Sequence, residues 1–471
     1  KLDSCVHTFA FCENGFMYDA LKKIGMENEV KFVHMSPVFK VGNFELRLPI
    51  PFASDADDFI LRIDDILKEM GMTTGEVFPG NQKSELKRLI SDLWNFTPEQ
   101  TRSIDDVDVM TFLCGYELNL SIFFMLAYLD GLYAVELPWE NSAGEFVRCF
   151  QVMFRELKHG YTEGGASAIP EAFAKYIMQS GGTVLTHAEV SKIAVENGKA
   201  KGVELKDGRK FSSDIVVSTT GVKETVFNLI GEEHFPDEYM KKAKDVKHSL
   251  SAVLLRIALD EKVTDDPVIV GMPLGNLDLN GLAKIASDLG LFNLTLPVLV
   301  NSLELIGVSR EDLSDAFKMA FFGGAFLDVL PGVMPIYAPV ISNYDPNLAP
   351  KGKQLIQTCT AASLRYNMRP WEKWVEAVYN ATCDMIPGLR EHTLWYDSAT
   401  PEDLEKFLGK EDGPAFSTAQ VIGQIGDGRF QNKSPIGGLY FAGDNAGGWG
   451  IGVELATKSA IECVNAIGAN T

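Results

Sequence analysis

The sequence is poor in the residues that build metal sites and disulfide frameworks. Its 471 residues include seven cysteines and seven histidines, without C-x-x-C, H-x-x-x-H or H-E-x-x-H spacing. An odd number of cysteines without such spacing favours a reducing compartment and no metal site. His7 stands near Cys5 and Cys12, but a packing or cavity role is the stronger interpretation of this histidine. No Ser/His/Asp signature or carboxylate pair points to hydrolysis.

Basic charge and long apolar runs are also scarce. Lysine and arginine number 43 against 64 aspartate and glutamate, a formal net charge of -21, so nucleic acid is not an expected partner. The longest uncharged stretches, 289–303 and 329–344, are shorter than the roughly 18 to 20 apolar residues that span a bilayer. We expect a cytoplasmic protein without a transmembrane helix. Peripheral membrane contact stays open, and the oligomeric state does not follow from the sequence.

Apolar character is abundant, at 46% of residues, and the length exceeds what one hydrophobic core supports, so two or three domains are expected. Residues 16–150 are predicted to be mostly helical, with one helix apolar on all sides at 118–129. This region predicts a helical cap over a cavity.

The pattern changes at residue 160. A helix opens at Pro170 and stops at residues 181–182. Short β-branched runs with turns at 197–198 and 207–208 then predict a small antiparallel excursion and a return strand.

Further along, strands are predicted at 250–260 and 354–362, and helices at 280–330 and 370–386. Prolines at every fourth residue from 331 to 339 exclude a continuing helix there.

Residues 437–460 read "GGLYFAGDNAGGWGIGVELATKSA". A buried strand at 438–442 is expected to end in Gly443-Asp444, with a glycine-rich loop and a helix from about residue 451. Successive free backbone amides and the helix dipole would attract an anionic group, and Asp444 would accept hydrogen bonds from sugar or ribityl hydroxyls. The loop therefore fits a nucleotide or a flavin. From spacing alone, a tight strand-to-helix turn with an aspartate cap explains it equally well.

This stretch resembles the C-terminal FAD motif of the phytoene desaturase and carotenoid isomerase family, within the amine oxidase-like flavoprotein superfamily. Residues 160–222, beginning "GYTEGGASAIPEAFAKYIMQSGG", resemble the family's middle segment. Residues 341–357 and 428–444 look like later landmarks in the expected order. The resemblance is weak in the helical regions.

The resemblance implies roles for matching residues. Asp444 would bind the ribityl or pyrophosphate part of FAD, and Gly443 would allow close approach. Gly450, Ile451 and Gly452 would set a helix N-terminus against the flavin pyrimidine edge, where its dipole stabilises the negative charge of reduced flavin.

The middle segment would supply the adenine side. Val190 would pair its backbone with adenine, although an ordinary core valine explains this position equally well. Thr219, Thr220 and Gly221 would end the return strand near the diphosphate.

Other positions are less settled. Gly164 and Gly165 would lie in the interior between flavin and substrate, and Arg429 would face either the cofactor phosphates or solvent. Glu454 stands where the family helix carries a small residue. It is a candidate acid or base near the flavin, but a solvated first-turn glutamate is the stronger interpretation.

One family feature is absent, because no G-x-G-x-x-G occurs in the 471 residues. The opening "KLDSCVHTF" is similar to the segment that comes after the family's first nucleotide-binding unit, and the first residue is not methionine. We therefore expect that one βαβ unit, roughly 30 to 50 residues, is missing in front. The competing hypothesis is a protein that never had this unit and does not bind FAD.

These observations predict an α/β fold with a discontinuous FAD-binding Rossmann-like domain whose N-terminal unit is truncated. An α+β substrate-binding domain, a mixed sheet with a helical cap, is interleaved with it. The expected bounds are 1–15, 160–235 and 425–471 for the FAD-binding domain, and 16–159 and 236–424 for the substrate-binding domain.

The resemblance implies an FAD-dependent oxidoreductase that desaturates or saturates a C–C bond by hydride transfer to or from flavin N5. The expected substrate is apolar and unsaturated, either carotenoid-like, terpenoid-like or alicyclic. Two alternatives stay open: a redox-neutral isomerase or hydratase that uses reduced FAD, and a non-catalytic lipid- or prenyl-binding protein on the same scaffold.

Overall fold

The computed structural model describes most of the chain. The described residues are 8–42, 44–47, 51–69, 71–156, 158–273, 293–305, 309, 334–366, 368 and 370–469. Cys5, His7 and most of the helical region expected at 280–330 lie outside them. Among the helices of the described part, none is both long enough and apolar enough to cross a membrane.

The described helices are α1 (Phe16–Lys23), α2 (Ala56–Glu69), α3 (Thr74–Val77), α4 (Gln82–Asn95), α5 (Pro98–Arg102), α6 (Val109–Leu113), α7 (Leu120–Ala134), α8 (Ala143–Gln151), α9 (Ala168–Gln179), α10 (Val222–Glu224), α11 (Asp237–Lys244), α13 (Leu296–Leu305), α16 (Ile341–Tyr344), α17 (Trp371–Met385), α18 (Leu389–His392), α19 (Pro401–Leu408) and α20 (Gly452–Gly468). The described strands are β1 (Phe32–His34), β2 (Val38–Val41), β3 (Phe44–Arg47), β4 (Gly160–Thr162), β5 (Val190–Glu196), β6 (Lys199–Leu205), β7 (Lys210–Ser212), β8 (Val216–Ser218), β9 (Ser251–Leu259), β10 (Val268–Met272), β11 (Ile336–Pro339), β12 (Gln354–Ala362), β13 (Thr393–Ala399) and β14 (Leu439–Phe441).

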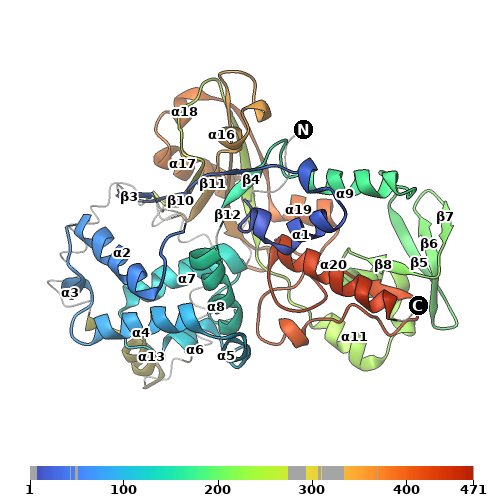
Figure 1. Cartoon of the computed structure of the whole chain (residues 1–471), viewed down its shortest axis with the longest axis horizontal. Helices are drawn as coiled ribbons and strands as arrows, with labels where there is room; N and C mark the ends of the chain where they lie inside the picture. The colour runs from blue at the N-terminus through green and yellow to red at the C-terminus, as the bar shows by residue number, and fades with distance from the viewer. Residues whose placement is uncertain are drawn as a thin grey trace.

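Helices α2 to α8 and α13 form a helical lobe on one side of the molecule (Figure 1). Apolar residues three and four apart place Leu86, Leu89 and Leu93 on one face of α4, and all three are buried in the core of the lobe. The predicted all-apolar helix at 118–129 is confirmed as part of α7.

A seven-stranded mixed sheet lies beside the lobe, in the order β13-β9-β12-β11-β10-β2-β3. Neighbouring strands are antiparallel except β10 and β2, which run parallel. Val253, Leu255 and Ile257 of β9 are buried in one core with Trp374 and Val378 of α17. The strands predicted at 250–260 and 354–362 and the helix predicted at 370–386 are confirmed.

The expectation that residues 16–150 are mostly helical missed three strands, β1 to β3. In β3 the half-buried Phe44 and Leu46 alternate with the exposed Glu45 and Arg47. This period of two is the strand signal, and it is only four residues long.

Strands β5 to β8 lie on the other side of the molecule (Figure 1), and β1 and β4 form a separate antiparallel pair. β8 and β14 pair in parallel, and β5, β6 and β7 form an antiparallel sheet. Asn197 and Gly198 have φ angles of 50° and 71° between β5 and β6, as a two-residue hairpin turn requires. Met240 and Ala243 of α11 belong to the core of this region, which therefore continues past the boundary expected at residue 235.

Gly271 allows β10 and β2 to approach closely in their parallel pairing. Its φ is +150°, and an added Cβ would lie 1.7 Å from the carbonyl oxygen of Lys40. Gly271→Ala must push β2 away, so we expect a loss of about 3 kcal/mol or more in the free energy of unfolding. Urea denaturation measures this loss.

Gly352→Ala is the matched control. Gly352 also has a positive φ, +79°, but nothing lies within 4 Å of its added Cβ. This variant should lose only about 1 kcal/mol. Equal losses in the two variants would contradict a steric role for Gly271.

Candidate functional site

The two segments predicted to bind a cofactor meet at the carboxyl ends of β8 and β14. Ser218 lies opposite Phe441 in the parallel ladder, and the Ala442 amide donates to the Ser218 carbonyl at 3.1 Å. Thr219 therefore lies next to Gly443, whose φ is +116° and whose added Cβ would be 3.8 Å from the Thr219 carbonyl oxygen. Ligands of open α/β sheets bind at such strand ends.

The loop after β14 does not present a row of free amides. Gly443 N donates to Ser459 Oγ at 3.2 Å, Gly447 N to the Phe430 carbonyl at 2.9 Å, and Gly448 N to Glu462 Oε2 at 3.2 Å. The expectation of successive free amides is therefore wrong at these three positions. The loop shape is held by the protein itself.

Arg429 is the main internal support of the loop. Its side chain is 1% exposed, and its guanidinium donates to the carbonyl of Gly448 at 2.7 Å and to Gln420 Oε1 at 3.0 Å. Burial lowers its pKa, and the negative charges of Glu145 and Asp444 oppose that shift. The interpretation as a surface arginine is wrong, because the side chain is buried.

Trp449 connects the loop to the helical lobe. Its indole Nε1 donates to Asp105 Oδ2 at 2.8 Å, and the guanidinium carbons of Arg102 and Arg148 lie 4.6 and 5.7 Å from its ring centroid. Arg148 Nη1 also donates to Asp105 Oδ1 at 2.8 Å. Trp449 is hundreds of residues from the other three in sequence, and no local sequence signal joins it to them.

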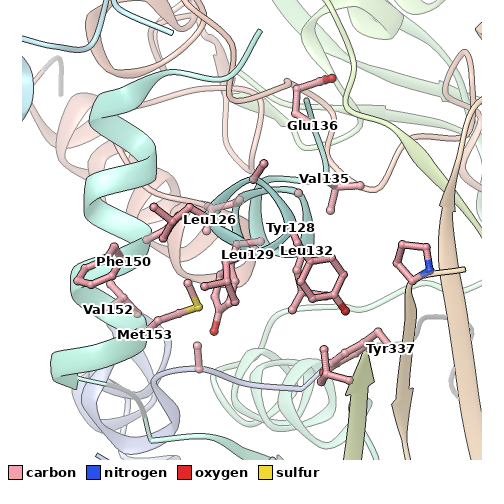
Figure 2. A pocket seen from close by; sticks show the side chains of 18 of the residues that line it. Leu126, Tyr128, Leu129, Leu132, Val135, Glu136, Phe150, Val152, Met153 and Tyr337 are labelled. Carbon is pink, nitrogen blue, oxygen red and sulfur yellow. The ribbon is translucent and has the colours of Figure 1, made fainter. Parts of the chain in front are cut away.

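A cavity of about 2060 Å³ extends from the N-terminal turn of α20 into the helical lobe. Asp444 and residues 449–456 form one end, and apolar side chains of α2, α4, α7, β2 and β3 form much of the wall. Figure 2 shows part of this wall, with Leu126, Tyr128, Leu129, Leu132, Val135, Glu136, Phe150, Val152, Met153 and Tyr337 labelled. The predicted cap over a cavity is present.

Few polar groups reach this cavity. Glu136 lines it, and burial, with the charge of Glu140, raises the pKa of its carboxyl to about 7. Glu145 also lines it, and burial raises its pKa against the charge of Arg148. Tyr128 lines the wall with a buried hydroxyl that has no hydrogen-bond partner among the described residues. The cavity wall is thus mostly apolar, with a small number of acids and hydroxyls and the side chains of Asn14, Arg148 and His159.

Glu454 lies in the first turn of α20 and also reaches the cavity. The Met17 amide donates to Glu454 Oε2 at 3.4 Å, at the start of α1. Burial raises the pKa of this carboxyl, and the backbone hydrogen bonds from Met17 and Phe16 oppose the rise. The solvated interpretation is wrong, because Glu454 is half-buried and caps a neighbouring helix.

The other predicted residues occupy varied places. Gly450, Ile451 and Gly452 line the cavity at the α20 N-terminus. Val190 is half-buried at the start of β5, opposite Leu205, and it is not part of the cavity wall.

The return-strand residues come directly after β8. Thr219 and Thr220 lead to Gly221, whose φ of +139° starts α10. Gly164 and Gly165 do not line the cavity: Gly165 is buried, but Gly164 is exposed, and its amide donates to Asp345 Oδ2 at 2.8 Å. The expected interior position therefore does not hold for Gly164, which forms a tight turn.

The side-chain amide of Asn445 indicates whether a polar group of a cofactor fits at the strand ends. Its side chain is 2% exposed, yet neither Oδ1 nor Nδ2 has a hydrogen-bond partner in the described part of the chain. An added Cβ on Gly443 would lie 3.2 Å from Asn445 Nδ2. A buried amide without partners is costly, so a polar group from outside the described residues fits here.

This geometry belongs to α/β proteins that bind a ligand at the carboxyl ends of parallel strands. The family described as flavin containing amine oxidoreductase matches residues 7–290. The chain belongs to this family.

Curated relatives are distant. Pyridine nucleotide-disulfide oxidoreductase domain-containing protein 2 of Mus musculus is 24% identical over 64% of this chain and 50% of its own length. Prolycopene isomerase 2 of an Oncidium hybrid cultivar is 23% identical over 66% and 46%, and a lycopene-forming phytoene desaturase of Pseudescherichia vulneris is 24% identical over 61% and 52%. The chain spans about half the length of the curated relatives it matches.

Solved structures share the fold. An oxidoreductase from Methanosarcina mazei matches with a TM-score of 0.63 and 18% identity, over 98% of this chain and 87% of that chain. A putrescine oxidase variant matches with a TM-score of 0.58 and 10% identity, over 99% and 88%. The mixed α/β fold predicted from the sequence is also the fold of these solved structures.

Arg429 gives a prediction about the loop. Arg429→Met leaves the carbonyl of Gly448 and the amide oxygen of Gln420 without donors, so we expect a loss of about 2 to 4 kcal/mol in unfolding free energy. Arg429→Lys should recover only part, because an ammonium cannot reach acceptors arranged for a planar fork. Urea denaturation compares both with Arg209→Met, a change at an exposed arginine. Similar losses in all three would contradict a special role for Arg429.

Glu136 gives a prediction about pH. Its folded-state pKa is about 7, above the ordinary value of 4.5. Below pH 4.5 the carboxyl is protonated in both states. As the pH rises towards 7 the unfolded chain loses its proton first, so stability falls, and above 7 the deficit stays constant.

Glu136→Gln removes this titration and keeps an acceptor for the Leu137 amide. The variant should match the wild type near pH 4 and be roughly 2 to 3 kcal/mol more stable at pH 8. Urea denaturation from pH 4 to 8 measures the difference, with Glu189→Gln, at an exposed glutamate, as control. A difference that does not change with pH would refute the raised pKa.

Proposed function

We propose that this protein is an FAD-dependent oxidoreductase that acts on an apolar, unsaturated substrate and desaturates or saturates a C–C bond. The observation that carries the proposal is the apolar cavity that opens directly onto the α20 N-terminus and Asp444. A site for an apolar molecule and the residues expected to hold a flavin therefore share one space.

The size of the cavity supports an extended substrate. At about 2060 Å³ it is at least twice the roughly 300 to 1,000 Å³ of an ordinary small-molecule pocket. It has room for the reactive end of a cofactor and for a long hydrocarbon together. A carotenoid-like or terpenoid-like molecule uses this volume better than a small alicyclic one.

The chain offers groups for FAD at several points. Asp444 would accept hydrogen bonds from polyol hydroxyls, the amide of the neighbouring Asn445 would bind polyol or phosphate groups, and Gly443 would allow their close approach. Gly450 and Ile451 at the start of α20 would place its positive dipole end against a developing negative charge. Bound FAD would supply the capacity to accept or donate a hydride at N5.

The other residues of the site orient the substrate and keep water away. The phenylalanine and leucine side chains of the lobe bury the substrate, which excludes solvent from the reacting bond. Because its pKa is raised to about 7, the carboxyl of Glu136 is present in both forms near neutral pH, so the protonated form would donate a proton beside the substrate and the carboxylate would receive one. A hydride transfer to or from a carbon chain needs such a partner for its proton.

We also propose that a further nucleotide-binding unit, from outside these 471 residues, packs on β8 and β14 and provides the adenine side. Parallel sheets are normally covered on both faces, and two strands alone are marginal. Exposed apolar side chains on the nearby elements support this unit, namely Ile177, Met178, Leu185, Phe211 and Val217. The unpartnered Asn445 amide is consistent with it.

The names of two relatives bear on the reaction. One is a phytoene desaturase and another a prolycopene isomerase, so a redox-neutral isomerisation with reduced FAD is the nearest alternative. A lipid- or prenyl-binding protein without catalysis is the alternative from another class. An anaerobic turnover experiment distinguishes both alternatives from the desaturase.

The test uses the purified full-length protein with FAD, an added quinone as electron acceptor, and two probes, phytoene and prolycopene in detergent micelles, under anaerobic conditions. We expect flavin absorbance bands on the protein and product formation that consumes one acceptor per double bond. Turnover that needs only a single initial reduction would indicate an isomerase. Absence of flavin bands after FAD addition would overturn the proposal and leave the binding protein.

A cavity variant separates substrate binding from cofactor binding. Leu132 lines the cavity, so Leu132→Trp should reduce turnover about tenfold to a hundredfold by displacing the substrate, with the flavin spectrum unchanged. Leu61→Trp makes the same change at a residue of α2 that is 60% exposed and outside the cavity wall. Equal turnover in the two variants would show that the substrate binds elsewhere.

A further inference from the structure

Three potential metal ligands meet at the surface of the molecule, outside the site described above. A sulfur, a carboxylate oxygen and a ring nitrogen of Cys12, Glu13 and His34 lie within 4.8 Å of one another. The His34 Nε2 and Glu13 Oε1 atoms are 3.0 Å apart. We refer to these residues as the Cys12 cluster.

The backbone explains why the cluster forms. Phe9 and Gly160 exchange backbone hydrogen bonds at 2.8 and 3.0 Å, and Gly160 lies opposite His34 in the β1–β4 ladder. Gly160 therefore lies between the two segments, and the Cys12 side chain lies against it. An added Cβ at Gly160 would lie 2.9 Å from Cys12 Sγ and 3.3 Å from His34 Nδ1, so glycine leaves the space in which these side chains meet.

Two features of the cluster indicate an additional ligand. Glu13 Oε2 is buried and has no hydrogen-bond partner among the described residues. Cys12 has a φ of +47°, a conformation that costs a residue other than glycine roughly 1 to 3 kcal/mol and recurs at ligand sites.

We propose that Cys12, Glu13 and His34 bind one Zn²⁺ ion. Sulfur, carboxylate oxygen and imidazole nitrogen are the ligands that zinc prefers in proteins. Bonds of about 2.0 to 2.3 Å at tetrahedral angles place the ligand atoms roughly 3.4 to 3.6 Å apart, which small side-chain rotations reach from the present positions. His34 is exposed, so the fourth position faces solvent and takes a water molecule.

Zinc must displace the proton of a buried thiol. Burial raises the pKa of Cys12, which donates a hydrogen bond to the Lys158 carbonyl at 2.7 Å. Binding therefore releases a proton and should strengthen as the pH rises. The sequence indicated no metal site because the ligands come from two separated segments and show none of the usual motif spacings.

The ion would link the segment that carries Cys12 and Glu13 to strand β1. Phe9, Phe11, Asn14 and Gly15 line the cavity, and the cluster connects their segment to β1 and β4. A ligand that binds only the folded chain raises its stability, so zinc is expected to raise the thermal midpoint and to hold this part of the cavity wall.

The test is a titration of chelator-treated full-length protein with Co²⁺ and with Zn²⁺. We expect one ion per chain, a near-ultraviolet thiolate-to-cobalt charge-transfer band, and displacement of cobalt by zinc. Cys12→Ser should abolish the band, and His34→Ala and Glu13→Gln should weaken binding about tenfold or more. His234→Ala is the control for a His–Glu pair without a cysteine, and Cys114→Ser is the control for a cysteine outside the cluster.

The possible results distinguish a zinc site from its absence. No saturable uptake by the wild type, a band that survives Cys12→Ser, or equal affinity in wild type and His34→Ala would each overturn the proposal. If Cys12→Ser does not fold, His34→Ala decides, because this side chain is exposed and its removal leaves the core intact. The result is independent of FAD binding, since the readout is the metal alone.

Discussion

The hydrogen bond from the buried guanidinium of Arg429 to the carbonyl of Gly448 is the interaction on which the ligand end of the molecule depends. Placing a cation in the interior costs several kcal/mol unless acceptors and charges surround it. Here the cost is offset by carbonyl and amide oxygens and by the charges of Glu145, Asp444 and Glu462. If the loop moved, the guanidinium and these oxygens would lose their hydrogen-bond partners. Trp449 is the next residue after Gly448, and its contacts with Asp105 join the loop to the helical lobe.

Local chemistry made much of the fold predictable. The Asn197-Gly198 turn, the all-apolar α7 and the strand-to-helix turn at Gly443 each depend on residues close together in sequence, so period and turn residues identify them. The three strands between residues 32 and 47 were missed because each has only three or four residues. Such strands are stabilised by neighbours from distant parts of the chain, as β2 is by β10.

The candidate site also has parts that could be predicted from the sequence and parts that could not. The nearness of Thr219 to Gly443 follows from two strands that end at one edge, which the family resemblance implied before the structure showed it. The partners of the loop amides lie 14 to 17 residues away, in other elements. The cap that Glu454 gives to α1 and the contacts of Trp449 with Asp105 join segments separated by hundreds of residues. No pattern within one segment encodes such contacts. Residues that shape the site indirectly are therefore the ones that sequence reasoning overlooks.

Under the proposed function, the nature of the cavity wall limits how the protein can choose a substrate. An apolar wall distinguishes molecules that differ by one methylene by only about 1 to 3 kcal/mol, so selectivity for a particular hydrocarbon must come from the length and shape of the cavity. The few polar side chains of the wall therefore contribute more to selectivity than their number suggests. Tyr128 presents an unpartnered hydroxyl and Glu136 a carboxyl with a raised pKa, and a substrate with a hydroxyl or carbonyl placed to meet them would gain far more than one additional methylene provides. These two side chains are therefore among the places where the wall can distinguish an oxygenated substrate from a pure hydrocarbon.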